Sequence, residues 1–173
     1  MIDFKNIEYL KQGNKRQQLA FNDLVKLDIF NVLQAFTPVL TGTIPIEIDI
    51  DDSDLDIICC CKDLNAFMDV LIKNFSFYPA FRITKKQIRN IETIISKFKS
   101  ENYTIEIFGQ NKPIEKQESY RHMLIEYKIL KEKSRDFRKQ IIELKKQGYK
   151  TEPAFAKLLS LKGNSYFELL KLD

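Results

Sequence analysis

Two aspartates, Asp54 and Asp56, flank Leu55 at the start of an apolar run that ends at Cys61. Side chains alternate between the faces of a strand, so residues two positions apart point to the same side. Aspartate is disfavoured in strands, and two in one short strand need a reason. Paired anionic oxygens are the ligands that hard divalent cations prefer. The pattern therefore predicts two carboxylates aimed at one cation, and the alternative is that they only solubilise an exposed sheet face.

A third carboxylate, Glu106, lies between two isoleucines in a second strand-like run, from Tyr103 to Phe108. It projects to the face opposite to these isoleucines, which would face a core. If the two strands are neighbours in one sheet, Asp54, Asp56 and Glu106 converge on one point. We expect these three acids to be catalytic residues and metal ligands, with Mg²⁺ or Mn²⁺ as the cofactor. Glu106 could instead serve as the base that takes a proton from an acceptor hydroxyl.

Length and composition indicate one globular domain. The chain has 173 residues, of which 44% are hydrophobic and 30% are charged, so it can bury a sizeable core. No stretch approaches the roughly 20 apolar residues that span a bilayer. The first 14 residues carry several charges and lack the apolar segment of a signal peptide. We expect a cytoplasmic protein that does not interact with membranes.

Charge is distributed unevenly along the chain. Residues 44–63 contain seven acidic side chains and one basic side chain, whereas residues 111–150 contain twelve basic and six acidic ones. The acidic segment is consistent with cation binding, and the basic segment could hold the phosphates of a nucleotide or a nucleic acid. A solvated surface is the alternative for most of these lysines.

Hydrophobic spacing predicts strands in the middle of the chain and helices at both ends. A long or broken helix is expected over residues 15–36, after a shorter helix. Residues 44–50 alternate isoleucine with other residues, which predicts an extended segment with one wet face. The remaining strands are expected at 38–43, 54–61, 81–84, 91–98 and 103–108. The remaining helices are expected at 62–74, 114–132, 134–147, 152–159 and 165–170.

This order of elements predicts the fold class α+β, with a mixed β-sheet covered by helices on one face. Residues 1–112 would form the core with its N-terminal helices. Residues 113–173 would form a helical C-terminal section packed on that core, so that the chain is one compact unit.

Gly42 and Thr43 come at the end of a predicted strand. Glycine there lets the backbone approach a phosphate, which a free amide and the threonine hydroxyl can bind. Glycine turns are common, so the pair gains its meaning from the ten residues that separate it from Asp54.

Gly-Thr, ten residues, Asp-Leu-Asp and a later acid within an apolar strand together resemble the signature of the nucleotidyltransferase superfamily with the polymerase-beta-like core. Gly-Ser is the usual pair there, and Thr43 keeps the hydroxyl. Longer matches over nearly the whole chain resemble an uncharacterised bacterial family still catalogued as a domain of unknown function. These matches are at residues 42–46, 53–57, 105–110, 120–123 and 150–155.

The resemblance implies a nucleotidyltransferase-like fold and the transfer of a nucleoside monophosphate from a nucleoside triphosphate to a hydroxyl acceptor. The acceptor, whether a small molecule, a protein or RNA, stays open. Arg121 is a candidate phosphate ligand because its planar guanidinium can bind two oxygens at once. The nucleotide-binding candidates are Gly42, Thr43, Ser53, Arg121 and Lys150, and the candidates for supporting positions around the metal ligands are Gln110, Gln117 and His122.

Two other functions fit the same residues. The fold can serve as a non-catalytic module that binds a nucleotide or a partner protein, for example as a component of a toxin-antitoxin pair. Alternatively, the basic C-terminal helices bind nucleic acid, with an affinity that falls steeply with salt. Release of pyrophosphate with some acceptor separates the enzyme from both alternatives.

Overall fold

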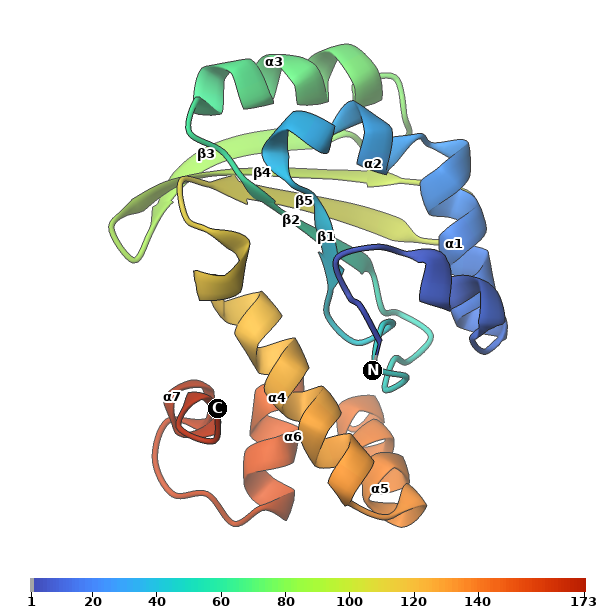
Figure 1. Cartoon of the computed structure of the whole chain (residues 1–173), viewed down its shortest axis with the longest axis vertical. Coiled ribbons are helices and arrows are strands. Elements are labelled where there is room, and N and C mark those ends of the chain that lie inside the picture. The colour runs from blue at the N-terminus through green and yellow to red at the C-terminus, as the bar shows by residue number, and fades with distance from the viewer. Residues whose placement is uncertain (1) are drawn as a thin grey trace.

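The fold is built on a mixed sheet of five strands in the order β1-β2-β5-β4-β3, in a computed structural model that describes residues 2–173 (Figure 1). β2 and β5 run parallel inside the sheet, and the other neighbouring strands are antiparallel. This confirms the predicted α+β class with a mixed sheet. The strands are β1 (Val39–Thr41), β2 (Leu55–Cys60), β3 (Arg82–Ile88), β4 (Ile91–Lys99) and β5 (Thr104–Gln110).

Helices from the first half of the chain cover one face of this sheet (Figure 1). Ile57 of β2 and Ile107 of β5 are fully buried in the core between them. The first long helix is broken, because Asp28 has a φ of 52°. These helices are η1 (Glu8–Gln12), α1 (Lys15–Lys26), α2 (Ile29–Val32), η2 (Gln34–Phe36) and α3 (Leu64–Phe75).

Alternate side chains of the same strands face the C-terminal helices. Val39 of β1 and Ile58 of β2 pack with these helices in a second core. Asp56 and Glu106 lie two residues before Ile58 and Phe108, so they point to this side as well. No helix within residues 2–173 is long and apolar enough to cross a membrane. The C-terminal helices are η3 (Ile114–Lys116), α4 (Glu118–Glu132), α5 (Arg135–Lys146), α6 (Thr151–Leu158) and α7 (Ser165–Leu170).

The prediction of one continuous helix over residues 114–132 is wrong at Gln117. This residue separates η3 from α4 and has an extended backbone, with a ψ of 136°. Its buried side-chain amide donates to the carbonyl of Cys59 at 3.0 Å and to the carbonyl of Lys112 at 2.9 Å. The break therefore ties the start of α4 to β2.

The prediction of an extended segment over residues 44–50 is also wrong. The chain turns here: the Ile48 amide bonds the carbonyl of Thr43 at 3.2 Å, and Glu47 has a φ of 60°. Pro45 has no N–H for a strand ladder. Pro45 is buried together with Ile44 and Ile46 on either side of it, so the alternation in sequence does not correspond to a wet face and a dry face.

Side chains from two helices satisfy the carbonyls of this loop. Gln17 and Arg16 of α1 bind carbonyls at its two ends, while Arg138 and Lys145 of α5 bind those in the middle. Lys145 Nζ lies 2.7 Å from the carbonyl oxygen of Ile48. The connection from β1 to β2 is thus held by segments far away in the sequence, rather than by a strand partner.

Asp23 of α1 anchors the turn between β4 and β5. Its side chain is buried and accepts hydrogen bonds from the Ser100 hydroxyl at 2.5 Å, the Asn102 amide at 2.9 Å and the Asn102 side-chain amide at 2.7 Å. The two strands that leave this turn carry Lys97 and Glu106, so Asp23 supports the face on which the acids lie.

We expect Asp23→Ala to lower the free energy of unfolding by about 2–4 kcal/mol, because three donors lose their acceptor in a buried turn. Urea unfolding followed by circular dichroism measures this loss. Asp69→Ala on the exposed side of α3 is the matched control and should change stability by less than about 0.5 kcal/mol. Equal effects of the two substitutions would contradict the anchoring role.

Candidate active site

Asp56 of β2 and Glu106 of β5 lie directly opposite each other in the parallel pair. On the other side of β2, Thr41 of β1 is the register partner of Asp56, and its hydroxyl donates to the Asp56 carbonyl at 3.3 Å. Asp54 lies just before β2. The two acidic runs are therefore neighbours in one sheet, which the sequence alone left open.

Lys97 of β4 joins the acids. It is the register partner of Glu106, and its Nζ lies 2.5 Å from Glu106 Oε2 and 3.5 Å from Asp54 Oδ2. Sequence reasoning missed this lysine. The position of Lys97 could have been predicted from the hairpin, because a turn at residues 100–102 brings the end of the preceding strand opposite the start of the next.

Burial and the neighbouring negative charges raise the pKa of Asp56 to about 7. Burial of the carboxyl group is the largest cause, followed by the charges of Asp54 and Glu106, while Lys97 and Lys145 act in the opposite direction. Positive charge from the chain therefore compensates the acids only in part, and an added cation would be attracted here.

The three carboxylates fit Mg²⁺ or Mn²⁺ by their chemistry, since both ions prefer oxygen ligands. In residues 2–173, however, no three acidic, histidine or cysteine side chains form a group already arranged for a metal ion. Lys97 instead bonds two of the three predicted ligands. Coordination of one ion by all three acids requires Lys97 to leave Asp54 and Glu106.

Gly42 follows β1 with a φ of +81°, and its Cα faces the acid pair. A Cβ added there would lie 2.6 Å from Asp56 Oδ2, so only glycine lets the backbone come this close to the carboxylate. The next residue, Thr43, has its hydroxyl 3.4 Å from Ser53 Oγ. Gly42 thus lies against Asp56, whereas Thr43 contacts the loop before Asp54.

A cavity of about 390 Å³ opens between the sheet and the C-terminal helices. Most of the predicted site residues line it, together with helix residues that the prediction did not include. The predicted residues that line it are Gly42, Thr43, Asp56, Glu106, Gln110, Gln117 and His122.

The structure does not bring Ser53, Asp54, Arg121 and Lys150 into this lining. Ser53 Oγ accepts from the Ile50 amide at 2.9 Å and so holds the loop before Asp54. Arg121 points to the C-terminal residue, with its Nη2 2.6 Å from Asp173 Oδ2. Lys150 is exposed just before α6.

His122 and Gln110 form parts of the cavity wall that are already bonded. His122 Nε2 lies 2.9 Å from the carbonyl oxygen of Tyr166, and its Nδ1 lies 3.3 Å from Glu152 Oε1. Gln110 Nε2 donates to the hydroxyl of Thr93 at 3.4 Å. These contacts fix the orientation of both side chains.

Two basic residues that sequence reasoning missed, Arg89 and Lys112, also line the cavity. Arg89 forms an ion pair with Glu118 of α4. The pKa of Lys112 is lowered by burial and then by the charges of Arg89 and Arg121. Positive charge gathered here suits an anionic group such as a phosphate. No local motif marks these residues, because one lies in the β3–β4 turn and the other after β5.

The arrangement is a nucleotidyltransferase fold, shared with solved polymerase structures. The Cid1 poly(U) polymerase with MgGTP bound matches with a TM-score of 0.56 and 12% identity, over 80% of this chain and 46% of that one. The polymerase core of TRAMP, an RNA surveillance complex, matches with a TM-score of 0.51 and 11% identity, over 91% of this chain and 49% of that one. At such identities the likeness shows the fold alone, and this chain spans about half the length of those chains.

Residues 22–172 match a protein family described as a domain of unknown function, DUF4269, and the chain belongs to this family. No curated protein matches the sequence.

We expect Gly42→Ala to lower the free energy of unfolding by about 2–3 kcal/mol, since a positive φ is strained for alanine and the new methyl group meets Asp56. Gly148→Ala is the matched control: its φ is +94°, and no atom lies within 4 Å of an added Cβ. The control should cost about 1 kcal/mol in the same urea unfolding experiment. If both substitutions lower the free energy of unfolding equally, the contact with Asp56 does not contribute to the loss of stability.

The raised pKa of Asp56 makes a second prediction. In the folded protein the Asp56 carboxyl group keeps its proton up to a pH of about 7, whereas in the unfolded chain it releases the proton near 3.8. The folded state therefore becomes less stable, relative to the unfolded chain, as pH rises between these values. We expect Asp56→Asn, measured in EDTA, to be more stable than wild type by about 2–4 kcal/mol above pH 7, and to lose this advantage toward pH 4. A stability difference independent of pH would contradict it.

Proposed function

We propose that this protein is a metal-dependent nucleotidyltransferase that transfers a nucleoside monophosphate from a nucleoside triphosphate to a hydroxyl acceptor. The observation that carries the proposal is the meeting of Asp56 and Glu106 across β2 and β5, with the Gly42 backbone against Asp56, at one cavity. The likeness in fold to the Cid1 poly(U) polymerase with MgGTP bound supports the same reaction class.

In this reaction the acceptor oxygen forms a bond to the α-phosphorus, and the bond from that phosphorus to pyrophosphate breaks. Mg²⁺ held by Asp54, Asp56 and Glu106 would neutralise the charge of the phosphates. Phosphoryl transfer asks the protein mainly for positioning and charge stabilisation. The free amide of the Gly-Thr turn and the cations Arg89 and Lys112 are the groups of this chain that can orient the triphosphate.

In an alternative arrangement, Asp54 and Asp56 alone hold the cation, and Glu106 serves instead as the base that takes the proton of the acceptor hydroxyl. Lys97 bonds its Oε2, which orients the carboxylate. A base must lie within hydrogen-bond reach of the proton it removes, and Glu106 faces the cavity beside Asp56. In this proposal Lys97 is a positioning residue rather than a catalytic one.

One observation favours the alternative, a non-catalytic nucleotide- or partner-binding module of the same fold. Lys97 already bonds two of the three acids, so part of their charge is balanced without a metal ion. In that case a nucleotide would bind through the Gly-Thr turn and the basic residues, and no pyrophosphate would be released.

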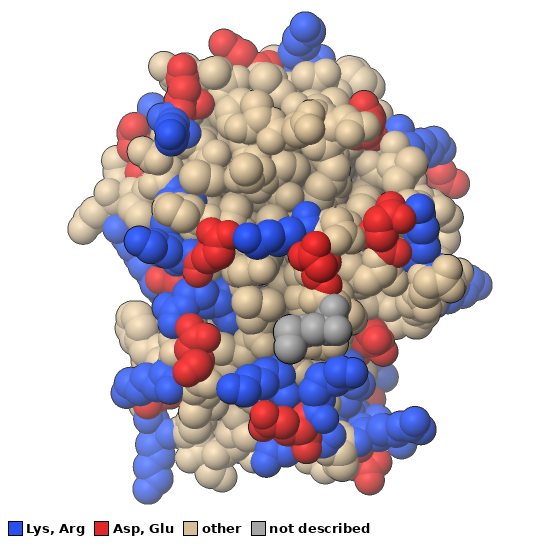
Figure 2. Space-filling model, viewed as in Figure 1, with Lys and Arg blue, Asp and Glu red and all other residues tan. Residues whose placement is uncertain are grey.

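Binding of nucleic acid by the C-terminal helices is not favoured in the same way. Figure 2 shows basic and acidic side chains intermixed over this part of the molecule. Arg138 and Lys145 bind backbone carbonyls of the loop at 44–50, and Arg121 binds Asp173. Several of the basic residues counted in the sequence are therefore committed to contacts within the chain.

We expect the Asp54→Ala, Asp56→Ala double variant to lose at least tenfold in affinity for a nucleoside triphosphate in the presence of Mg²⁺, because the predicted metal ligands are gone. Isothermal titration calorimetry with each of the four ribonucleoside triphosphates measures the affinity, and a pyrophosphate assay measures turnover.

The Asp51→Ala, Asp52→Ala double variant is the matched control. These two acids are exposed in the neighbouring turn, and replacing them removes the same number of negative charges. It should bind and turn over like wild type. If both double variants bind the triphosphate as wild type does, the proposed metal site is wrong. If binding is lost only in the first variant and wild type releases no pyrophosphate, the binding module is the better description.

A further inference from the structure

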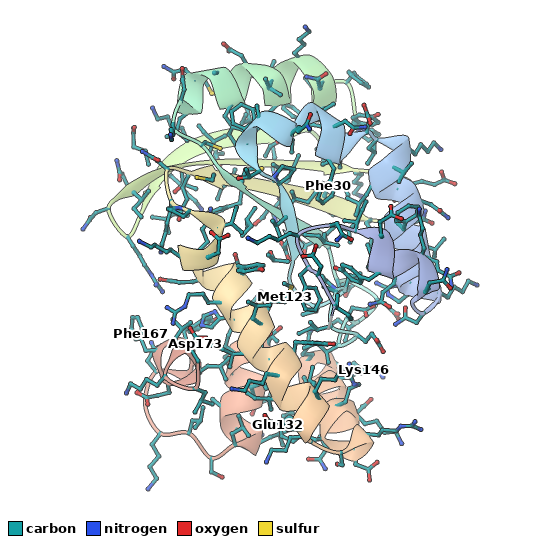
Figure 3. The ribbon with its side chains drawn as sticks, in the orientation of Figure 1. Phe30, Met123, Glu132, Lys146, Phe167 and Asp173 are labelled. Atoms are coloured by element: carbon teal, nitrogen blue, oxygen red, sulfur yellow. The ribbon has the colours of Figure 1, made fainter. Side chains whose placement is uncertain are left out.

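One wall of the cavity is formed by residues at the start and in the middle of α4 and by α6. This wall includes Gln117, which directly precedes α4 and is bonded to β2, Glu126 of α4, and Glu152 of α6. Met123 lines the same cavity and marks this part of α4 in Figure 3. The proposed phosphate chemistry assigns no role to these side chains.

Two oxygen atoms in this wall are buried without a hydrogen-bond partner. Glu126 is 3% exposed and Gln117 is 2% exposed, and within residues 2–173 neither Glu126 Oε1 nor Gln117 Oε1 has a partner. Buried polar atoms are almost always bonded, so each exception calls for an explanation.

The orientation of the Gln117 amide follows from its neighbours. Its nitrogen lies within 3.0 Å of two carbonyl oxygens, those of Cys59 and Lys112, which can only accept. The side chain therefore cannot turn over, and its oxygen must remain an acceptor without a donor from the chain.

The groups around Glu126 do not supply that donor either. Burial raises the pKa of Glu126, the charge of Glu152 raises it further, and Lys145 acts in the opposite direction. The ammonium of Lys145 is bonded to the Ile48 carbonyl, and His122 Nδ1 lies toward Glu152 rather than Glu126. The neutral form of the Glu126 carboxyl group, which the raised pKa favours, still keeps an acceptor oxygen. The chain thus places acceptors here and uses its nearby donors elsewhere.

We propose that this wall of the cavity, along which Gln117, Glu126 and Glu152 lie, binds a part of the substrate that carries hydrogen-bond donors in the form of hydroxyl or amino groups. The inference rests on the proposed function for the identity of the cavity as the substrate site. Two sources offer such donors: the amino group of a nucleobase, or the hydroxyl and amino groups of the acceptor.

The test replaces Glu126 with methionine, which keeps the size of the side chain and removes the unpaired oxygen. Because an unpaired buried carboxyl group is removed, Glu126→Met should fold at least as stably as wild type. Glu132→Met is the matched control: it carries the same substitution in the exposed last turn of α4 (Figure 3).

Two experiments distinguish the sources. ATP is compared by calorimetry with purine riboside triphosphate, which lacks the amino group, both with Mg²⁺. Glucosamine, which carries hydroxyl and amino groups and no phosphate, is titrated while the side-chain amide of Gln117 is followed by NMR. A nucleobase site predicts that wild type prefers ATP at least tenfold and that only Glu126→Met abolishes this preference. An acceptor site predicts that glucosamine shifts the Gln117 amide in wild type and in Glu132→Met but not in Glu126→Met.

The proposal is overturned if wild type shows neither the preference for ATP nor the glucosamine shift, or if Glu126→Met behaves like Glu132→Met with both probes. The wild-type NMR titration decides the acceptor arm even if Glu126→Met fails to fold. Failure of the proposed function has a different signature, since the Asp54→Ala, Asp56→Ala variant would then bind ATP as wild type does while the response to glucosamine still depends on Glu126.

Discussion

The parallel pairing of β2 with β5 is the constraint on which the rest of the site depends. It places Asp56 beside Glu106, and with them two like charges in the interior of a sheet. Such a pair is unfavourable in a bare fold: burial raises the pKa of Asp56, and the charges of Asp54 and Glu106 raise it further. Lys97 on the next strand relieves part of the cost by bonding Glu106 and Asp54. The fold therefore preserves an acid cluster that packing alone would disfavour.

The loop at residues 44–50 explains why the distance from Gly42 to Asp54 matters in three dimensions. Its carbonyls are bound by Arg16 and Gln17 of α1 from one side and by side chains of α5 from the other. The loop returns the chain from β1 to β2 so that the Gly42 backbone lies against Asp56. The C-terminal helices thus take part in shaping the acid face, in addition to forming the opposite wall of the cavity.

The sequence was sufficient to predict what depends on strand alternation. The α+β class and the strands that carry Asp56 and Glu106 followed from period-2 patterns, and the structure puts β2 beside β5, with Asp54 just before β2. The roles of Lys97 and Glu126 could not be predicted from the sequence. Strand pairing brings Lys97 to the site and helix packing brings Glu126, and both depend on segments that are distant in the sequence. The loop at 44–50 misled because its alternating isoleucines resemble a strand, whereas tertiary donors satisfy its backbone. Arg121 was chosen for its chemistry, and its contact with Asp173 is not visible in any local pattern.

The cavity combines three kinds of group that a single substrate can satisfy together. Acids on the sheet attract a cation, Arg89 and Lys112 suit an anion, and Gln117 and Glu126 present acceptors without donors. Each feature costs stability in the folded chain, through like charges, a lowered lysine pKa or unpaired buried oxygens. A ligand that carries phosphates, an associated cation and donor groups would relieve all three at once and so stabilise the folded state on binding. Functional sites commonly contain features that destabilise the folded state, and here these features lie around one cavity.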